Sequence, residues 1–89
     1  MIHQTLGRGN HLPIAIETLR RAVELYPNSA PLRAELAVTL DLAGLDDDAR
    51  IEATEALRLN EITFHAGHND KLLQDELEQE VRRINESRN

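Results

Sequence analysis

The sequence of 89 residues contains no cysteine, no tryptophan, one phenylalanine and one tyrosine. Without cysteine there are no disulfide bonds and no thiolate metal ligands, and the sequence does not indicate the redox compartment. With so few aromatic side chains, the chain lacks platforms on which single-stranded bases could stack. It also has no apolar run close to the ~20 residues that a membrane span needs. The core must therefore be built from Ala, Leu, Ile and Val.

Positive charge is scarce, with 10 Lys and Arg against 16 Asp and Glu and a net charge of -6. Binding to nucleic acid needs clustered basic residues that neutralise phosphates, and an anionic membrane surface needs the same. The sequence therefore predicts neither partner. The N-terminal residues 1–4 lack the charged region and apolar core of a signal peptide. A chain of this length predicts one domain.

Catalytic and cofactor motifs are also missing. We find no nucleophile–base arrangement and no phosphate-cradling glycine loop. The run Gly7-Arg8-Gly9 lacks both a third glycine and a preceding strand. We therefore predict no enzymatic activity and no cofactor.

One group of residues, His65, His68 and Asp70, has the chemistry of a zinc or nickel site. Gly67 and Asn69 favour a loop there, and two imidazoles with one carboxylate make an incomplete ligand set, so we predict no native metal site. The acidic run at 46–48 lacks the alternating ligands of a calcium loop. It is typical of a helix start, where Asp46 can cap a free N–H and carboxylates face the positive end of the dipole.

The strongest positive feature is a repeat with a step of 34 residues, the period of a helix–turn–helix unit. The residues that recur are Ile2 as Leu36, Leu6 as Leu40, Ala15 as Ala49, Ala22 as Ala56 and Leu25 as Leu59. Such units bury their apolar faces by stacking on one another. The repeat therefore predicts an all-α fold.

Apolar spacing and turn residues place the helices along the chain. Residues 1–8 are expected to end a helix that the glycines around Gly7 and Gly9 stop, and Gly44 is expected to end another. The predicted helices cover 13–26, 31–43, 46 to about 59–60, and 72–86, with a loop over 62–71.

The order small, large, small, proline at Ala15, Leu19, Ala22 and Pro27 resembles the second helix of a tetratricopeptide repeat. The next unit continues the resemblance with Leu36, Ala37, Leu40, Gly44, Ala49, Ala53 and Ala56. It departs from the pattern at Glu61, where proline is usual, and at Ala53, where a larger residue is usual. The resemblance implies an α-solenoid of antiparallel helix pairs, with about one and a half repeats and a C-terminal capping helix. The expected parts are a partial first repeat (1–27), a second repeat (30–61), the loop (62–71) and the capping helix (72–86).

The resemblance implies a module that binds a protein or peptide through a concave face lined by the first helix of each unit. The residues expected on that face are Ala34, Glu35, Val38, Asp41 and Leu42. Because Ala34 and Val38 are neither polar nor basic, a clamp for a terminal carboxylate is not expected, and an apolar or weakly basic peptide fits better.

By the 34-residue step, the first helix of the first unit would need residues before Met1. We therefore expect the apolar face of the helix at 13–26 to be partly uncovered. Either the chain is the C-terminal piece of a longer repeat protein, or it self-associates through this N-terminal edge. A homodimer module and a regulatory tail of a larger, enzymatic chain are the alternatives to a peptide-binding scaffold.

Overall fold

Four helices make up the part of the chain that the computed structural model describes, residues 2–66 and 75–86, with side chains placed for 12–62 and 75–86. The helices are α1 (Ile2–Leu25), α2 (Ala30–Leu42), α3 (Asp46–Ala66) and α4 (Asp75–Glu86). Within these ranges there is no strand. The predicted all-α class is therefore confirmed.

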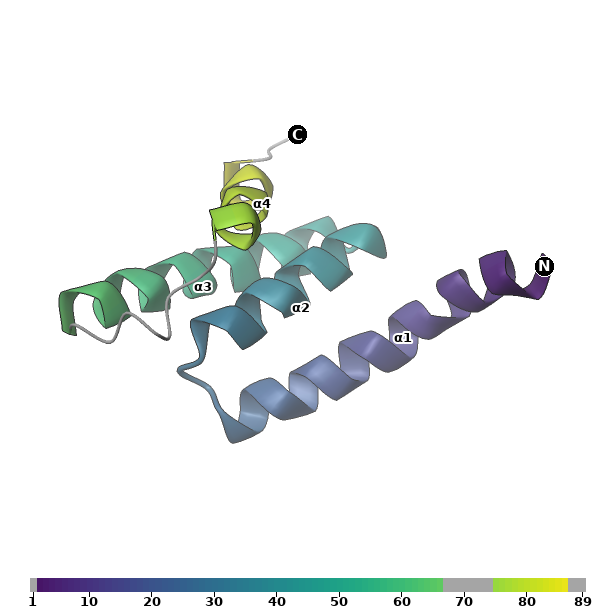
Figure 1. The fold of residues 1–89 in the computed structure, drawn as a ribbon, viewed down its shortest axis with the longest axis horizontal. Helices are drawn as coiled ribbons and strands as arrows, with labels where there is room; N and C mark the ends of the chain where they lie inside the picture. The colour runs from purple at the N-terminus through teal and green to yellow at the C-terminus, as the bar shows by residue number, and fades with distance from the viewer. Residues whose placement is uncertain (1, 67–74, 87–89) are drawn as a thin grey trace.

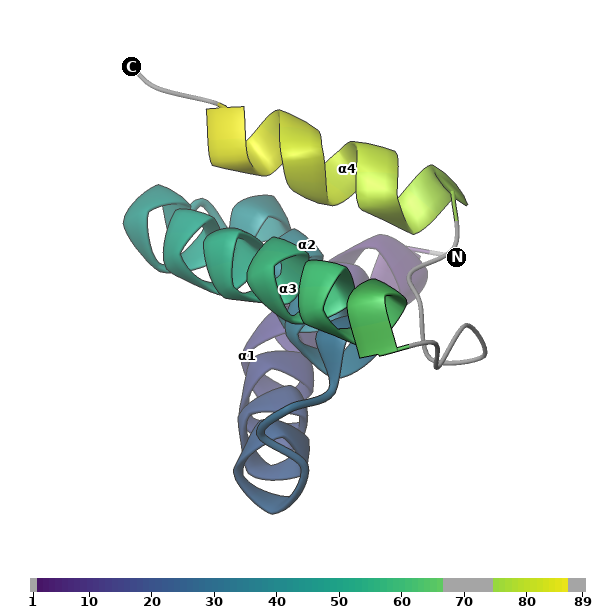
Figure 2. The same ribbon diagram turned by 90° about the vertical axis from the view of Figure 1, so that its left-hand side faces the viewer.

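The helices lie in three layers (Figures 1 and 2). α2 and α3 run side by side in opposite directions and form the middle layer. α4 crosses over one side of this pair, and α1 lies on the other side. α2 contacts all three other helices. It is therefore the central element of the fold.

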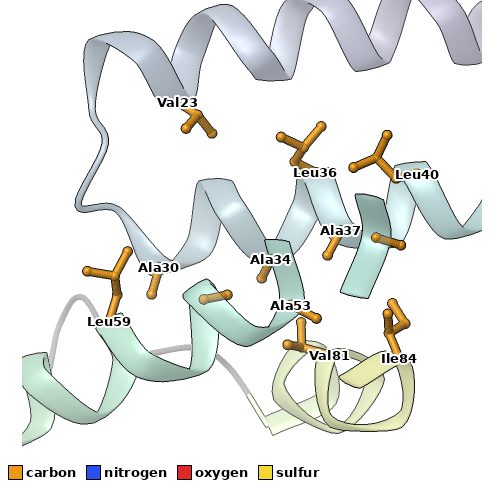
Figure 3. Packing of buried hydrophobic residues seen from close by; sticks show 12 residues of the cluster. Val23, Ala30, Ala34, Leu36, Ala37, Leu40, Ala53, Leu59, Val81 and Ile84 are labelled. Carbon is orange, nitrogen blue, oxygen red and sulfur yellow. The ribbon is translucent and has the colours of Figure 1, made fainter. Parts of the chain in front are cut away.

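The core lies between these layers and consists of small and aliphatic side chains. Its largest fully buried side chains are Leu36, Leu40 and Val81. In Figure 3, Leu36 and Leu40 point from α2 towards α1, while Val81 of α4 lies close to Ala53 of α3. The remaining members are Val23, Ala30, Ala34, Ala37, Ala49, Ala56, Leu59 and Ile84. The small alanine side chains allow α2, α3 and α4 to pack closely.

Both ends of α2 are fixed by local hydrogen bonds. At its start, the Ser29 hydroxyl accepts a hydrogen bond from the Leu32 N–H at 3.3 Å, and Pro31 occupies the first turn, where its missing N–H costs nothing. At its end, Gly44 has a positive φ of 81°. The Leu45 N–H donates to the Leu40 carbonyl at 2.9 Å, and the Gly44 N–H donates to the Asp41 carbonyl at 3.0 Å. This pattern closes the helix, as predicted for Gly44.

The predicted helix stop at Gly7 and Gly9 is wrong. α1 continues from Ile2 through both glycines and through Pro13 to Leu25. Among the described glycines only Gly44 has a positive φ, so the two N-terminal glycines take no helix-ending conformation. A glycine inside a helix costs only about 1 kcal/mol, which the flanking helical turns can offset. The helix ends just before Pro27 and Asn28, close to the predicted end at 26.

The predicted end of the third helix near 59–60 is also wrong, because α3 continues to Ala66. Glu61 stands where the resemblance expects proline, and its N–H and unbranched side chain let the helix continue. The first part of the predicted loop, 62–66, is therefore helical. α3 begins at Asp46 as expected. The predicted capping role of Asp46 is however wrong, because Asp46 is the first helical residue. The capping position belongs to Leu45, whose carbonyl accepts the first helical hydrogen bond, from the Ala49 N–H at 2.9 Å.

α4 ends at Glu86, as predicted, and the predicted start at 72 lies outside the described residues. Val81 and Ile84 are buried, and Leu77 packs against them. Its other side is polar, with Asp75 and Glu76 in the first turn. α4 therefore covers the α2–α3 pair with one face and carries charge on the other. No helix among the described residues is long and apolar enough to cross a membrane.

Candidate interaction surfaces

An ion pair fixes α2 against α3 beside the predicted binding face. The Arg33 guanidinium lies 3.0 Å from the Glu52 carboxylate, and both side chains are largely shielded from solvent. Arg33 Nε also donates to the Pro27 carbonyl at 3.0 Å. Because one guanidinium holds α3 and the turn before α2 together, α2 is a rigid platform for its exposed side chains.

The five residues predicted for the concave face differ in how far they are exposed to solvent. Ala34 is fully buried and lies in the core close to Ala53 (Figure 3). It cannot contact a partner, so its prediction as a binding residue is wrong. The physical reason is that α3 and α4 cover the side of α2 on which Ala34 lies.

Asp41 is half-buried and engaged by α4. Its carboxylate oxygen accepts a hydrogen bond from Arg83 Nη2 at 3.1 Å. The same guanidinium also binds Glu80 at 2.7 Å. The hydrogen bonds to Glu80 and to Asp41 raise the pKa of Arg83. Asp41 therefore anchors α4 on α2, and a ligand would have to compete with Arg83 for it.

Three of the predicted residues remain on the surface and form what we call the outer face of α2: Glu35, Val38 and Leu42. Leu42 is 69% exposed. Val38 is half-buried and packs partly against the core, and Glu35 is exposed. Residues at this spacing share one side of a helix. The outer face is therefore a short apolar strip with a carboxylate at its N-terminal end.

A second apolar surface lies on α1, as expected from the sequence. Ile14 is 65% exposed and Leu25 is 74% exposed. Ala15 and Ala22 lie between them and are half-buried. On the opposite side of the helix, Val23 is buried against α2. The apolar residues of α1 are thus buried on the side that faces α2 and exposed on the opposite side.

Ile51, which sequence reasoning did not single out, is a further exposed apolar residue. It is 64% exposed on α3 and lines a shallow, open depression of about 300 Å³ with Asp47, Arg50 and Thr54. Its position outside the stripe of Ala49, Ala53 and Ala56 was the available signal. The depression has no buried polar group and offers little to orient a ligand.

Charges on the described surface are mostly paired within one helix. On α3, Arg58 Nε donates to the Glu55 carboxylate at 3.1 Å. This hydrogen bond holds the pKa of the Glu55 carboxyl below its ordinary value. On α4, Arg82 pairs with Glu78 at 2.7 Å. Such pairs are typical of solvated helix faces, and they do not converge on a catalytic centre.

The side chains of the metal-ligand candidates lie outside the part of the chain that the structure describes. His65 belongs to α3, but its side chain lies outside the described part, as do His68 and Asp70. Among the residues that the structure describes, no group of three His, Asp or Glu side chains could hold a metal ion. The prediction of no metal site at 65–70 therefore stays a prediction.

Comparison with known proteins gives no match: neither a family model, nor a curated protein, nor a solved structure is similar to this chain.

Proposed function

We propose that this chain is a non-enzymatic interaction module that binds a partner protein or peptide along the outer face of α2. The observation that carries the proposal is Leu42, 69% exposed on the helix that is packed by α1, α3 and α4. Exposed apolar side chains on a rigid element are typical of binding surfaces. The resemblance to tetratricopeptide repeats supports it, because such proteins bind partners with the first helix of each unit.

The chemistry of the outer face favours a particular ligand. Val38 and Leu42 offer an apolar strip, and the exposed Glu35 carboxylate lies at one end of it. The chain as a whole carries a net charge of -6, which attracts basic partners at long range. We therefore propose an apolar or weakly basic peptide, with an aliphatic side chain against Leu42 and a Lys or Arg near Glu35.

The proposal can be tested by selecting peptides from a displayed library against the immobilised full chain. Selected peptides are then titrated into the 15N-labelled protein, and the perturbed amide signals are mapped. We expect the largest shifts at Glu35, Val38 and Leu42. We also expect Leu42→Glu to weaken binding by about tenfold or more, which corresponds to the loss of about 1.4 kcal/mol.

Ile51→Glu is the matched control, because Ile51 is 64% exposed but lies on α3. It introduces the same charge at a similarly exposed site and should leave peptide affinity unchanged. If no peptide is selected above background, or if Leu42→Glu and Ile51→Glu weaken binding equally, the outer face of α2 is not the binding surface.

A further inference from the structure

The 34-residue step relates α1 to α3, two helices that share a sequence pattern but have different neighbours. Ala49 and Ala56 of α3 are fully buried, in a helix that contacts both α4 and the antiparallel α2 (Figure 1). Their equivalents on α1, Ala15 and Ala22, are only half-buried. Neighbouring helices thus cover the small residues of α3, whereas those of α1 lie on a side that no described helix covers fully.

The uncovered surface is continuous along α1. Positions 14, 15, 18, 22 and 25 recur at helical spacing and lie on one side of the helix. We call this surface the alanine face of α1, made of Ile14, Ala15, Thr18, Ala22 and Leu25. Its centre is small and its ends are large. Small residues at a helix contact allow two axes to approach closely.

We infer that the alanine face of α1 is covered by the same face of a second copy, forming a symmetric dimer distinct from the peptide-binding surface proposed above. A two-fold axis across α1 makes the two helices antiparallel, the orientation that α2 has against α3. With the axis near Thr18, Ile14 of one copy packs on Ala22 of the other. Ile14, the large residue at one end of the face, thus fills the space over a small one.

The charges beside this face on one copy are complementary to the same charges on a second, antiparallel copy. Glu17 and Arg21 lie at its edge and pair within α1 at 3.1 Å, with both side chains largely exposed. An antiparallel pair brings Glu17 of one copy near Arg21 of the other, twice by symmetry. The same contact attracts in an antiparallel pair and repels when either charge is reversed. This charge pattern favours a second copy as the occupant.

The first test is the oligomeric state of the full chain. Light scattering and sedimentation from micromolar to millimolar concentration should show a reversible monomer–dimer equilibrium. Ala22→Glu should raise the dimer dissociation constant at least tenfold, because it buries a charge at the interface. Leu42→Glu should leave the dimer unchanged. A strict monomer at millimolar concentration overturns the inference, and it leaves the peptide-binding proposal intact.

Charge reversal tests the antiparallel geometry. Glu17→Arg and Arg21→Glu should each weaken the dimer several-fold, and the double reversal should restore it, because the pair is then complementary again. A dimer that is insensitive to the single reversals, or that the double reversal fails to restore, contradicts this arrangement.

A cysteine at the proposed axis gives an independent geometric readout, because the chain has no natural cysteine. Thr18 is exposed and helical, so Thr18→Cys should leave the fold intact. Two-fold symmetry then places the two thiols opposite each other, and mild oxidation should produce a covalent dimer. Ile51→Cys should crosslink at least tenfold more slowly under the same conditions. Equal rates for the two variants would contradict an axis near Thr18.

Discussion

α1 and α3 are related by the 34-residue step of the sequence, yet their equivalent residues lie in different surroundings. α3 is packed between α2 and α4, whereas α1 contacts mainly α2. As a result, Leu59 is 5% exposed and its equivalent Leu25 is 74% exposed. The same sequence pattern therefore has different energetic weight in the two helices, because burial depends on the neighbours that cover a face.

The difference extends to the proposed roles of the helices. In α3 the small residues Ala49, Ala53 and Ala56 are all fully buried, and they stabilise the fold by close packing. In α1 the small residues remain half-exposed and are free to contact another molecule. If this comparison is correct, equivalent substitutions should affect stability in α3 and association in α1.

The largest effect is expected for the leucine pair. Leu59→Ala should lower the free energy of unfolding by about 2–4 kcal/mol, because it removes a buried side chain and leaves a cavity. Leu25→Ala should change it by less than about 0.5 kcal/mol, because the side chain is already in solvent. Urea unfolding followed by circular dichroism, at low micromolar concentration, measures both. Equal losses for the two variants would show that Leu25 is covered in solution.

The alanine pair should give the next largest effect. Ala56→Leu adds volume to a fully buried site and should cost about 1–3 kcal/mol through overpacking. Ala22→Leu adds the same atoms at a half-exposed site, and it should change stability by less than about 0.5 kcal/mol. Thermal unfolding at low protein concentration provides the measurement. A stability loss at Ala22 that matches the loss at Ala56 would contradict the open face of α1.

These pairs also show how far sequence reasoning reaches. The periodic apolar residues predict the all-α class and the buried side of α2 and α3, since Leu36, Leu40 and Ala56 are all in the core. The hydrogen-bonded end of α2 follows from Gly44 alone. These features are local or repeat at a fixed spacing, so a single sequence is sufficient to predict them.

Features that depend on long-range packing were predicted less well. The resemblance places Ala34 on the binding face, but the structure buries it fully, because α3 and α4 cover that side of α2. The glycines near the start of α1 predict a helix stop, although helix ends depend on the balance between a local cost and the turns on either side. α3 extends beyond its predicted end near 59–60 for the same reason, since Glu61 lacks the restriction that proline imposes.

The smallest effect on stability is expected when two glycines are replaced by alanine, and its sign should differ between Gly44 at the end of α2 and Gly9 in α1. Gly44 ends α2 with a φ of 81°, and a Cβ built there meets no atom within 4 Å. Gly44→Ala should therefore cost about 1–2 kcal/mol through backbone strain alone. Gly9 lies inside α1, so Gly9→Ala should instead stabilise the helix by about 0.5–1 kcal/mol.

The sign of the Gly9→Ala effect tests whether α1 is one continuous helix. Far-ultraviolet circular dichroism should show increased helicity for Gly9→Ala, because alanine favours the helical conformation that α1 adopts there. Gly44→Ala should lower the unfolding midpoint without such a gain. If α1 ended at Gly9 with a left-handed residue, both substitutions would destabilise, and the N-terminal turns would form a separate helix. Opposite signs for the two glycines therefore distinguish a continuous α1 from the broken helix that the sequence suggests.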